Sequence, residues 1–357
     1  MKVIQVVTQM EAAGAQRVAY MLHQRFLKED HRSELVFLYT RRPAYEGLTG
    51  VRSLLGHPPS ALDYVRISCK LAALLHAEKP DVLITHTHYS NILGQSIGLL
   101  CGVTRRIAVN HSPDSIYSAA ARAVDRIVGS SSIYTEIVAV SDSVEVSLAE
   151  YPAAYREKIT VINNGVSVSN EAVDKARVKA RFHIPSNAPL LVNVGRLNQV
   201  KNQSLLLRAL TFLPEVHLVI VGDGELRNDL LSLAGSLCLE NRVHLAGELP
   251  SAEVNAIVAG CDVFLFPSIA EAMGLALAEA MLLSRPIVAS DIPALCRLLR
   301  DGGILAPAED AVAWARTIER ILSDADLANA LGASARRIAS QYSPEKMASQ
   351  YLSLMAT

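Results

Sequence analysis

The chain has 357 residues, half of them apolar, and its 34 basic and 35 acidic side chains give a formal net charge of -1. This composition excludes a disordered chain and a dedicated nucleic-acid binder, which usually carries a basic excess. No uninterrupted apolar run is long enough to cross a bilayer, and at about 150 residues per domain the length predicts two domains.

Short β-branched runs alternate with amphipathic segments along the chain. In the first half we expect strands over residues 3–7, 35–39, 82–85, 106–109, 137–140 and 158–162, with helices that include 15–27 and 67–77. In the second half we expect strands over 190–194, 217–221, 243–245, 263–266 and 286–289. Continuous apolar strands separated by helices indicate parallel sheets covered on both faces. Because a strand comes first, we expect no signal peptide.

A polar stretch between Gly165 and Pro189 separates the two series of strands. We place one domain at residues 1–170 and the second at 171–357, and expect the last helix, about residues 343–357, to pack back on the first domain. The predicted fold is two Rossmann-like, doubly wound α/β domains. They would face each other across a cleft at the carboxyl ends of their strands, where such folds bind ligands.

The five cysteines include no Cys-x-x-Cys pair. This pattern predicts neither a disulfide framework nor a zinc site, and it favours a reducing compartment. We therefore expect a cytoplasmic protein.

The segment from Glu271 to Glu279 gives the strongest local signal for a binding site. It follows the predicted strand 263–266 and places Gly274 near the start of a helix. Backbone amides and the helix dipole at such a start favour an anion, and the two glutamates suit hydroxyl groups of the same ligand. The alternative is a surface helix with two ordinary glutamates.

Two cations follow the predicted strand 190–194. Gly195 permits a turn, and Arg196 and Lys201 come directly after it. A guanidinium fork and an ammonium point charge suit a diphosphate, whereas the alternative is a pair of solvated surface cations. Further along, Gly222 begins a Gly-x-Gly pattern, but Arg227 stands where a dinucleotide fingerprint has its third glycine, so a tight turn is the better interpretation.

Histidines lie at the ends of two predicted strands of the first half. His86 and His88 are spaced like metal ligands, but no carboxylate or cysteine lies beside them, so we expect both to line the cleft. His111 follows the strand 106–109, and a structural and a functional role remain equally open for it. Asp324 and Asp326 fall between two helices and not after a strand, so we reject them as a metal motif.

The order and spacing of these segments resemble glycosyltransferase family 4, whose members are retaining enzymes of the GT-B fold. The resemblance is carried by residues 14–17, 79–86, 138–141, 161–166, 195–197 with Lys201, 221–224 and 271–279. It implies an acceptor-binding N-terminal domain and a nucleotide-sugar-binding C-terminal domain. It also implies that the departing phosphate assists attack on the same face of the sugar without a protein nucleophile. A metal or other cofactor would not be required, which agrees with the absence of a credible carboxylate cluster in the sequence.

The resemblance also implies roles for individual residues. Arg196 and Lys201 would bind the donor diphosphate, Glu271 would hold sugar hydroxyls, and His111 would line the sugar pocket. Glu279 would hold the ribose hydroxyls. The remaining donor-binding residues that it implies are Gly14, Gly195, Gly222, Met273, Gly274 and Leu275, with Gly14 approaching from the other domain. The family usually has glycine at the position of Ala13 and an aromatic residue at that of Met273, which predicts an altered pocket shape.

The sequence therefore predicts a retaining hexosyltransferase that uses a nucleotide sugar, a UDP-sugar in preference to a GDP-sugar. The acceptor would be a saccharide or a lipid-linked molecule, in cell-surface polysaccharide or glycoconjugate synthesis. Two alternatives remain: a nucleotide-sugar epimerase of the same fold, and an inactive nucleotide-sugar-binding scaffold. Acceptor specificity is expected in residues 45–59 and 112–118.

Basic residues gather in the first third of the chain. They are Arg17, Arg25, Lys28, Arg32, Arg41 and Arg42, and they lie near a predicted apolar helical face. Such a pattern predicts peripheral contact with the cytoplasmic membrane leaflet. Ordinary solvated charge is the alternative.

Overall fold

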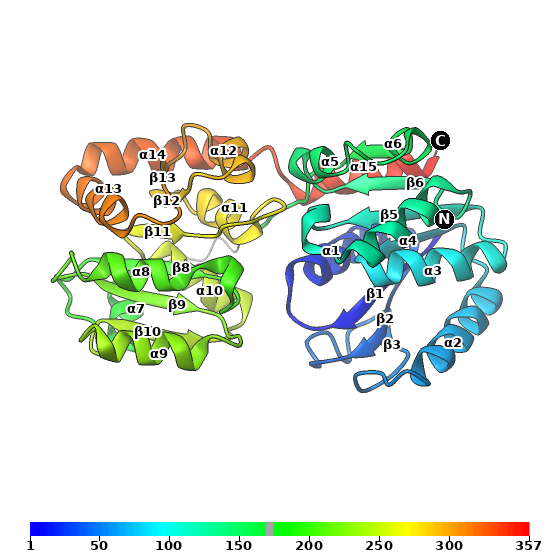
Figure 1. Cartoon of the computed structure of the whole chain (residues 1–357), viewed down its shortest axis with the longest axis horizontal. Coiled ribbons are helices and arrows are strands. Elements are labelled where there is room, and N and C mark those ends of the chain that lie inside the picture. The colour runs from blue at the N-terminus through cyan, green and yellow to red at the C-terminus, as the bar shows by residue number, and fades with distance from the viewer. Residues whose placement is uncertain (169–173, 357) are drawn as a thin grey trace. The chain divides into compact units, whose positions relative to one another are not determined.

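The computed structural model describes residues 1–168 and 174–356 (Figure 1). It divides the chain into two compact units, which are Met1–Gly165 with Tyr342–Thr357, and Val166–Gln341. We call them unit 1 and unit 2. Each contains one parallel sheet with helices, so the predicted class of two parallel α/β domains is confirmed. The expected boundary between residues 170 and 171 lies outside the described residues.

Unit 1 is built on a seven-stranded sheet in the order β3-β2-β1-β4-β5-β6-β7. Its strands are β1 (Lys2–Met10), β2 (Arg32–Thr40), β3 (Val51–Ser53), β4 (Val82–His86), β5 (Arg105–Asn110), β6 (Glu136–Ala139) and β7 (Ile159–Val161). Its helices are α1 (Gly14–Lys28), α2 (Asp63–Glu78), α3 (His88–Leu100), η1 (Asp114–Ile116), α4 (Ala119–Ser130), α5 (Asp142–Ser147), α6 (Ala153–Arg156) and α15 (Pro344–Ala356).

The sheet of unit 1 is buried because helices pack on its apolar side chains. Helix α1 turns Val18, Ala19, Leu22 and Phe26 inward, at the three- and four-residue spacing of one helical face, and none of the four is exposed. Helix α15 belongs to the same unit, and the guanidinium of Arg25 on α1 forms an ion pair with Glu345 on α15.

Unit 2 repeats the design with a six-stranded sheet in the order β10-β9-β8-β11-β12-β13. Its strands are β8 (Leu190–Val194), β9 (His217–Val221), β10 (Val243–Gly247), β11 (Val263–Phe266), β12 (Ile287–Ser290) and β13 (Ile304–Ala306). Its helices are α7 (Lys175–Arg181), η2 (Gln199–Lys201), α8 (Gln203–Leu210), α9 (Arg227–Ser236), α10 (Ser251–Ala259), α11 (Leu275–Leu282), α12 (Pro293–Leu299), α13 (Ala311–Ser323) and α14 (Ala325–Ala339).

The strand order fixes where a ligand of unit 2 would bind. Strand β8 lies between β9 and β11, so the loops that leave β8 and β11 start side by side and lead to opposite faces of the sheet. Ligands of doubly wound sheets bind at such a switch point, outside the carboxyl ends of the strands.

Two strands of the structure are absent from the sequence prediction. Strands β3 and β13 contain three residues each and lie at the edges of their sheets. Three residues are too few to show an alternating or continuous apolar pattern. In addition, no helix among the described residues is long and apolar enough to cross a membrane.

Candidate functional site

The loops after β8 and β11 meet through an ion pair. The ammonium of Lys201 lies against the carboxylate of Glu271, and the Lys201 side chain is 23% exposed while that of Glu271 is 11% exposed. A backbone hydrogen bond of 2.9 Å from Ile269 to the carbonyl of Val200 ties the two loops together. The sequence predicted both residues as site residues but not their contact.

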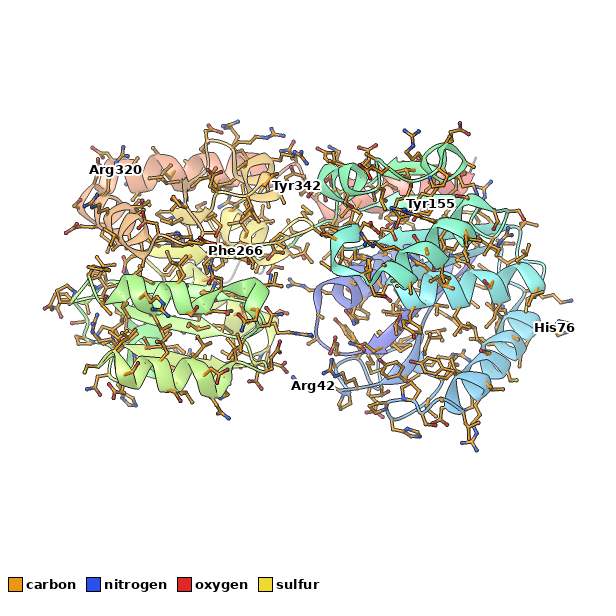
Figure 2. The ribbon with its side chains drawn as sticks, viewed as in Figure 1. Arg42, His76, Tyr155, Phe266, Arg320 and Tyr342 are labelled. Carbon is orange, nitrogen blue, oxygen red and sulfur yellow. The ribbon has the colours of Figure 1, made fainter. Side chains whose placement is uncertain are left out.

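Lys201 is held in place by its own loop. The side chain of Asn198 caps the short helix η2 by accepting a hydrogen bond of 3.1 Å from the Lys201 amide. The ammonium also lies 5.1 Å from the centre of the Phe266 ring, at the end of β11, where a cation–π interaction is favourable (Figure 2 labels Phe266). These contacts direct the charge toward the carboxyl edge of the sheet.

The glycines of unit 2 serve packing between neighbouring loops. Gly222 has a φ of +133°, and a Cβ there would lie 2.1 Å from the carbonyl oxygen of Gly195. The Gly195 amide in turn donates a 3.0 Å hydrogen bond to the carbonyl of Val221. The loops after β8 and β9 thus touch backbone to backbone, which agrees with the tight-turn interpretation of the Gly-x-Gly pattern.

Helix α11 begins where the sequence places an anion site. Gly274 immediately precedes the helix with a φ of +83°, which favours glycine, and Leu275 is the first helical residue. The first amides of a helix have no acceptor inside it, so they are available to a ligand. Among the described residues no side chain caps this helix, and its first turn contains no acidic residue. Met273 is 5% exposed, so its side chain belongs to the interior and only its backbone suits this role.

The other two candidates of unit 2 differ in exposure. Glu279 lies on α11 and is 7% exposed, whereas the side chain of Arg196 is exposed. The backbone carbonyl of Arg196 accepts a 3.0 Å hydrogen bond from Gln203 Nε2, which ties the loop after β8 to the first residue of α8. Both candidates lie on elements that leave the switch point.

Gly14 and His111 belong to unit 1, at the carboxyl ends of its strands. Gly14 is exposed and opens α1 after β1, while His111 follows β5 directly and is partly exposed. Burial lowers the pKa of His111 from 6.5 to about 3, which keeps its imidazole neutral. The structure describes the two units separately, so it brings Lys201 to Glu271 and Gly195 to Gly222 but does not place these two residues beside them.

The expectation that His86 lines the cleft is wrong. The residue is completely buried, and its ring is hydrogen bonded to His111 and Gln5. His88, the first residue of α3, stacks on Tyr117 with ring centres 4.4 Å apart. No group of three or more His, Cys, Asp or Glu side chains in the described ranges is placed to hold a metal ion.

A network of phenols supports the sheet edge next to His111. Asn110 Nδ2 donates to the Tyr155 hydroxyl at 3.1 Å, and Tyr155 and Tyr134 donate to the two oxygens of the Asp125 carboxylate at 2.8 and 2.9 Å (Figure 2 labels Tyr155). Desolvation is the largest influence on Asp125 and raises the pKa of this carboxyl. The network was not predicted, because its members lie far apart in the sequence.

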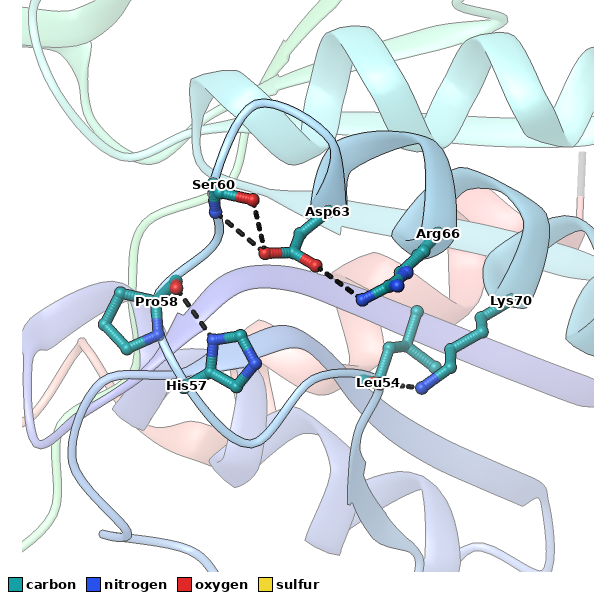
Figure 3. Close-up of polar contacts among 7 residues, drawn as sticks. All are labelled: Leu54, His57, Pro58, Ser60, Asp63, Arg66 and Lys70. Carbon is teal, nitrogen blue, oxygen red and sulfur yellow. Dashed lines mark hydrogen bonds and ion pairs between the residues drawn. The ribbon is translucent and has the colours of Figure 1, made fainter.

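The first segment in which we expected acceptor specificity, residues 45–59, contains β3 and is followed by an ordered turn. Asp63 at the start of α2 accepts hydrogen bonds from the Ser60 amide at 3.0 Å and the Ser60 hydroxyl at 2.7 Å, and Arg66 donates to it at 3.3 Å (Figure 3). Lys70 Nζ donates to the carbonyl of Leu54 at 2.7 Å. Helix α2 therefore anchors the connection between β3 and α2 at Leu54, near its start, and at Ser60, near its end.

Four residues near the switch point escaped the sequence analysis. Asn193, Gln203, Ser268 and Ser290 are buried, and each has a side-chain oxygen without a hydrogen-bond partner among the described residues. Asn193 and Gln203 do use their amide nitrogens, on the carbonyls of Leu265 and Arg196. A polar residue within an apolar strand could have signalled Asn193 and Ser290, but the sequence holds no such signal for Gln203 at the start of α8.

Fold and site together define a two-unit, doubly wound α/β protein in which an ion pair joins two loops at the switch point of unit 2. Residues 12–170 match the model of Glycosyltransferase Family 4, and residues 174–338 match that of Glycosyl transferases group 1. The chain thus belongs to the family 4 glycosyltransferases of the GT-B fold.

Relatives of known or assigned activity include a bacterial enzyme of lipopolysaccharide synthesis. The lipopolysaccharide core biosynthesis glycosyltransferase LpsE of Rhizobium meliloti is 31% identical over 57% of this chain and 59% of its own length, so the match covers less than two thirds of that relative. The uncharacterized glycosyltransferase MJ1607 of Methanocaldococcus jannaschii is 23% identical over 85% of this chain and 83% of its own length.

Solved structures share the fold over the whole chain. HepE of Anabaena, in complex with UDP and glucose, has a TM-score of 0.88 at 19% identity, and all of both chains is covered. WaaG, a glycosyltransferase involved in lipopolysaccharide biosynthesis, has a TM-score of 0.78 at 15% identity over 97% of this chain and 98% of its own. These similarities confirm the GT-B fold.

Proposed function

We propose that the protein is a retaining, metal-independent hexosyltransferase that moves a sugar from a nucleotide sugar, a UDP-sugar in preference to a GDP-sugar, to a saccharide or lipid-linked acceptor. The observation that carries this proposal is the ion pair between Lys201 and Glu271 beside the start of α11. A cation for a diphosphate, a carboxylate for hydroxyl groups and free helix amides are the groups that a nucleotide sugar requires.

The relatives support the choice of donor and pathway. HepE of Anabaena binds UDP and UDP-glucose, and LpsE acts in lipopolysaccharide core biosynthesis. We therefore infer a UDP-sugar as donor and cell-surface polysaccharide or glycoconjugate synthesis as the process. The active protein would work in the cytoplasm.

In the proposed reaction, the bond between the anomeric carbon and the diphosphate oxygen breaks as the acceptor oxygen approaches the same face of the sugar. The acceptor proton passes to the departing phosphate oxygen, so no protein nucleophile is needed. Arg196, Lys201 and the first amides of α11 stabilise the charge that develops on the diphosphate. Because these groups neutralise that charge, we expect no requirement for a divalent metal.

Glu271 has to serve two partners in this scheme. Its carboxylate holds Lys201 in place and also accepts hydrogen bonds from sugar hydroxyls. A carboxylate has two oxygens and about four lone-pair sites, so both contacts can coexist. Glu279, which is buried on α11, would hold the ribose hydroxyls.

Product analysis separates this function from its alternatives. A transferase consumes the nucleotide sugar only when an acceptor is present, apart from slow hydrolysis, and it releases the nucleoside diphosphate. An epimerase converts the donor without an acceptor, and a scaffold binds it unchanged. Incubation of UDP-glucose and other nucleotide sugars with and without oligosaccharide acceptors, in the presence of EDTA, tests all three.

Contact with the cytoplasmic membrane leaflet is a further part of the proposal, and it would be electrostatic. The apolar face of α1 is buried in unit 1, and Arg25 and Arg41 form ion pairs with Glu345 and Glu11. Lys28 and Arg32 have exposed side chains near the end of α1. Co-flotation with anionic liposomes at low salt, lost in Lys28→Glu/Arg32→Glu, would support contact, and no co-flotation of the wild type would contradict it.

A further inference from the structure

Two fully buried side chains form a hydrogen-bonded line that ends on His111. His86 Nδ1 lies 3.0 Å from His111 Nε2, and His86 Nε2 lies 2.9 Å from Gln5 Oε1. Gln5 and His86 have no exposed surface and come from the paired strands β1 and β4. The line thus runs from the core of the sheet to its carboxyl edge.

The position of each proton in this line follows from the acceptor at its buried end, which is the amide oxygen of Gln5. A neutral imidazole has one donor nitrogen and one acceptor nitrogen, and an amide oxygen only accepts. His86 must therefore donate from Nε2 to Gln5, which leaves His86 Nδ1 as an acceptor. His111 must then donate from Nε2, so that its Nδ1 carries no proton.

Burial keeps both rings neutral, as this assignment requires. Desolvation lowers the pKa of His86 well below its usual value, and His111 adds to that effect. Desolvation also lowers the pKa of His111 to about 3. A protonated His86 would lose Nδ1 as the acceptor within the line, and a protonated His111 would lose its bare Nδ1.

The second nitrogen of His111 remains available. Among the described residues, the His111 side chain makes its hydrogen bond through Nε2, and the residue is partly exposed at the carboxyl end of β5. An imidazole with one anchored nitrogen and one open nitrogen can present a fixed hydrogen-bonding group to a ligand.

We propose that His86 and Gln5 are positioning residues that hold His111 in its Nε2–H tautomer, so that His111 Nδ1 accepts a hydrogen bond from a hydroxyl of the transferred sugar. The sugar contact rests on the proposed function, whereas the tautomer is a property of unit 1 alone. The consequence is selectivity: an acceptor nitrogen attracts a neutral hydroxyl and repels a carboxylate at the same place.

The proposed tautomer of His111 depends on the orientation of the Gln5 side-chain amide. Among the described residues, Gln5 Nε2 has no hydrogen-bond partner. The opposite amide orientation would direct this nitrogen at His86, reverse the tautomer of both rings and turn His111 Nδ1 into a donor. The tautomer of His111 therefore reports directly on this assignment.

The first test reads the tautomer in the full-length protein. Long-range nitrogen–proton correlation spectra of the chain labelled with ¹⁵N-histidine distinguish protonated from bare ring nitrogens, and loss of signals in His111→Asn and His86→Asn assigns the two rings. We expect the Nε2–H form for both at neutral pH. The Nδ1–H form or an imidazolium at His111 would overturn the proposal, and the tautomer is read from the wild-type spectrum once the folded variants have assigned the two rings.

The second test compares two buried glutamines. Gln5→Leu removes the end of the line, whereas Gln95→Leu removes an equally buried amide that donates to Thr85 Oγ1 and to the Ile107 carbonyl, both at 2.7 Å. We expect mixed His111 tautomers and an about fivefold higher donor KM only in Gln5→Leu, since one hydrogen bond contributes roughly 1 kcal/mol.

The outcomes separate the two proposals. An unchanged tautomer in Gln5→Leu overturns the positioning role, and mixed tautomers with an unchanged donor KM overturn the sugar contact. A wild-type chain with the Nε2–H tautomer but no transfer to any acceptor overturns the proposed function and leaves the tautomer assignment standing.

Discussion

Lys201 and Glu271 form an ion pair although 70 positions separate them in the sequence. The pair joins the two loops that leave the switch point of unit 2, and both side chains are largely buried. Neither loop alone provides both charges that a nucleotide sugar needs. The fold creates this combination by placing β11 next to β8.

Replacement of Lys201 should abolish transfer without unfolding the protein. Removal of one group that stabilises a developing negative charge costs about 10²–10³ in kcat, so we expect at least this loss in Lys201→Ala. The matched control is Lys175→Ala. Lys175 is the first residue of α7 in the same unit, and it also forms an ion pair with a carboxylate, that of Asp262. Initial rates of nucleotide release measure both. Near-normal turnover in Lys201→Ala would contradict the role.

Replacement of Glu271 and of Glu279 should affect the affinities for UDP and for a UDP-sugar differently. Glu279→Gln should weaken binding of UDP and of a UDP-sugar about equally, by roughly tenfold or more, because the ribose is common to both. Glu271→Gln should weaken the UDP-sugar more than UDP. Titration calorimetry with each ligand measures the difference, with Glu253→Gln, an exposed partner of Arg181, as control. The same loss for both ligands in both variants would contradict the assignment.

Gly222→Ala should destabilise unit 2. The new Cβ would lie 2.1 Å from the Gly195 carbonyl oxygen, and the φ of +133° strains any side chain. Gly247→Ala is the control, because its φ is +73° but a Cβ there meets no described atom within 4 Å. We expect a loss of more than about 2 kcal/mol in the free energy of unfolding for Gly222→Ala and about 1 kcal/mol for Gly247→Ala. Equal losses would mean that the backbone contact is unimportant.

The buried histidines predict how stability depends on pH. Burial lowers the pKa of His111 from 6.5 to about 3, and that of His86 falls as well. The unfolded chain therefore takes up protons below pH 6.5 that the folded chain does not, so the free energy of unfolding decreases as the pH falls through this window. One histidine contributes a slope of at most about 1.4 kcal/mol per pH unit.

Urea unfolding at about pH 7.5, 6 and 5 measures this slope. The slope should be smaller in His111→Asn than in the wild type. Burial also lowers the pKa of His244 to about 4, and this contribution to the slope is the same in both proteins. Identical slopes would show that the pKa of His111 is not lowered in the folded protein.

Much of the fold could be predicted from the sequence because the strands are apolar on both faces. Strands β4 and β11 are completely buried, and such runs stand out between amphipathic helices. The edge strands β3 and β13 could not be predicted, since three residues show no period. Their positions are set by pairing with β2 and β12.

The candidate site could be predicted only as separate segments. The positions of Gly274 and Lys201 after apolar strands indicated an anion site, but the contact of Lys201 with Glu271 depends on strand order. The line from Gln5 through His86 to His111 depends on it as well, because it crosses from β1 over β4 to the end of β5. Sequence spacing contains no information on such neighbours.

Calorimetric titration of the full chain with a panel of nucleoside diphosphates and nucleotide sugars in EDTA measures directly whether unit 2 holds a donor site. We expect binding of one nucleotide family, with UDP and UDP-sugars ahead of the GDP series, and loss of this binding in Lys201→Ala but not in Lys175→Ala. No binding across the panel, or equal binding by Lys201→Ala and the wild type, would contradict the assignment of the donor site.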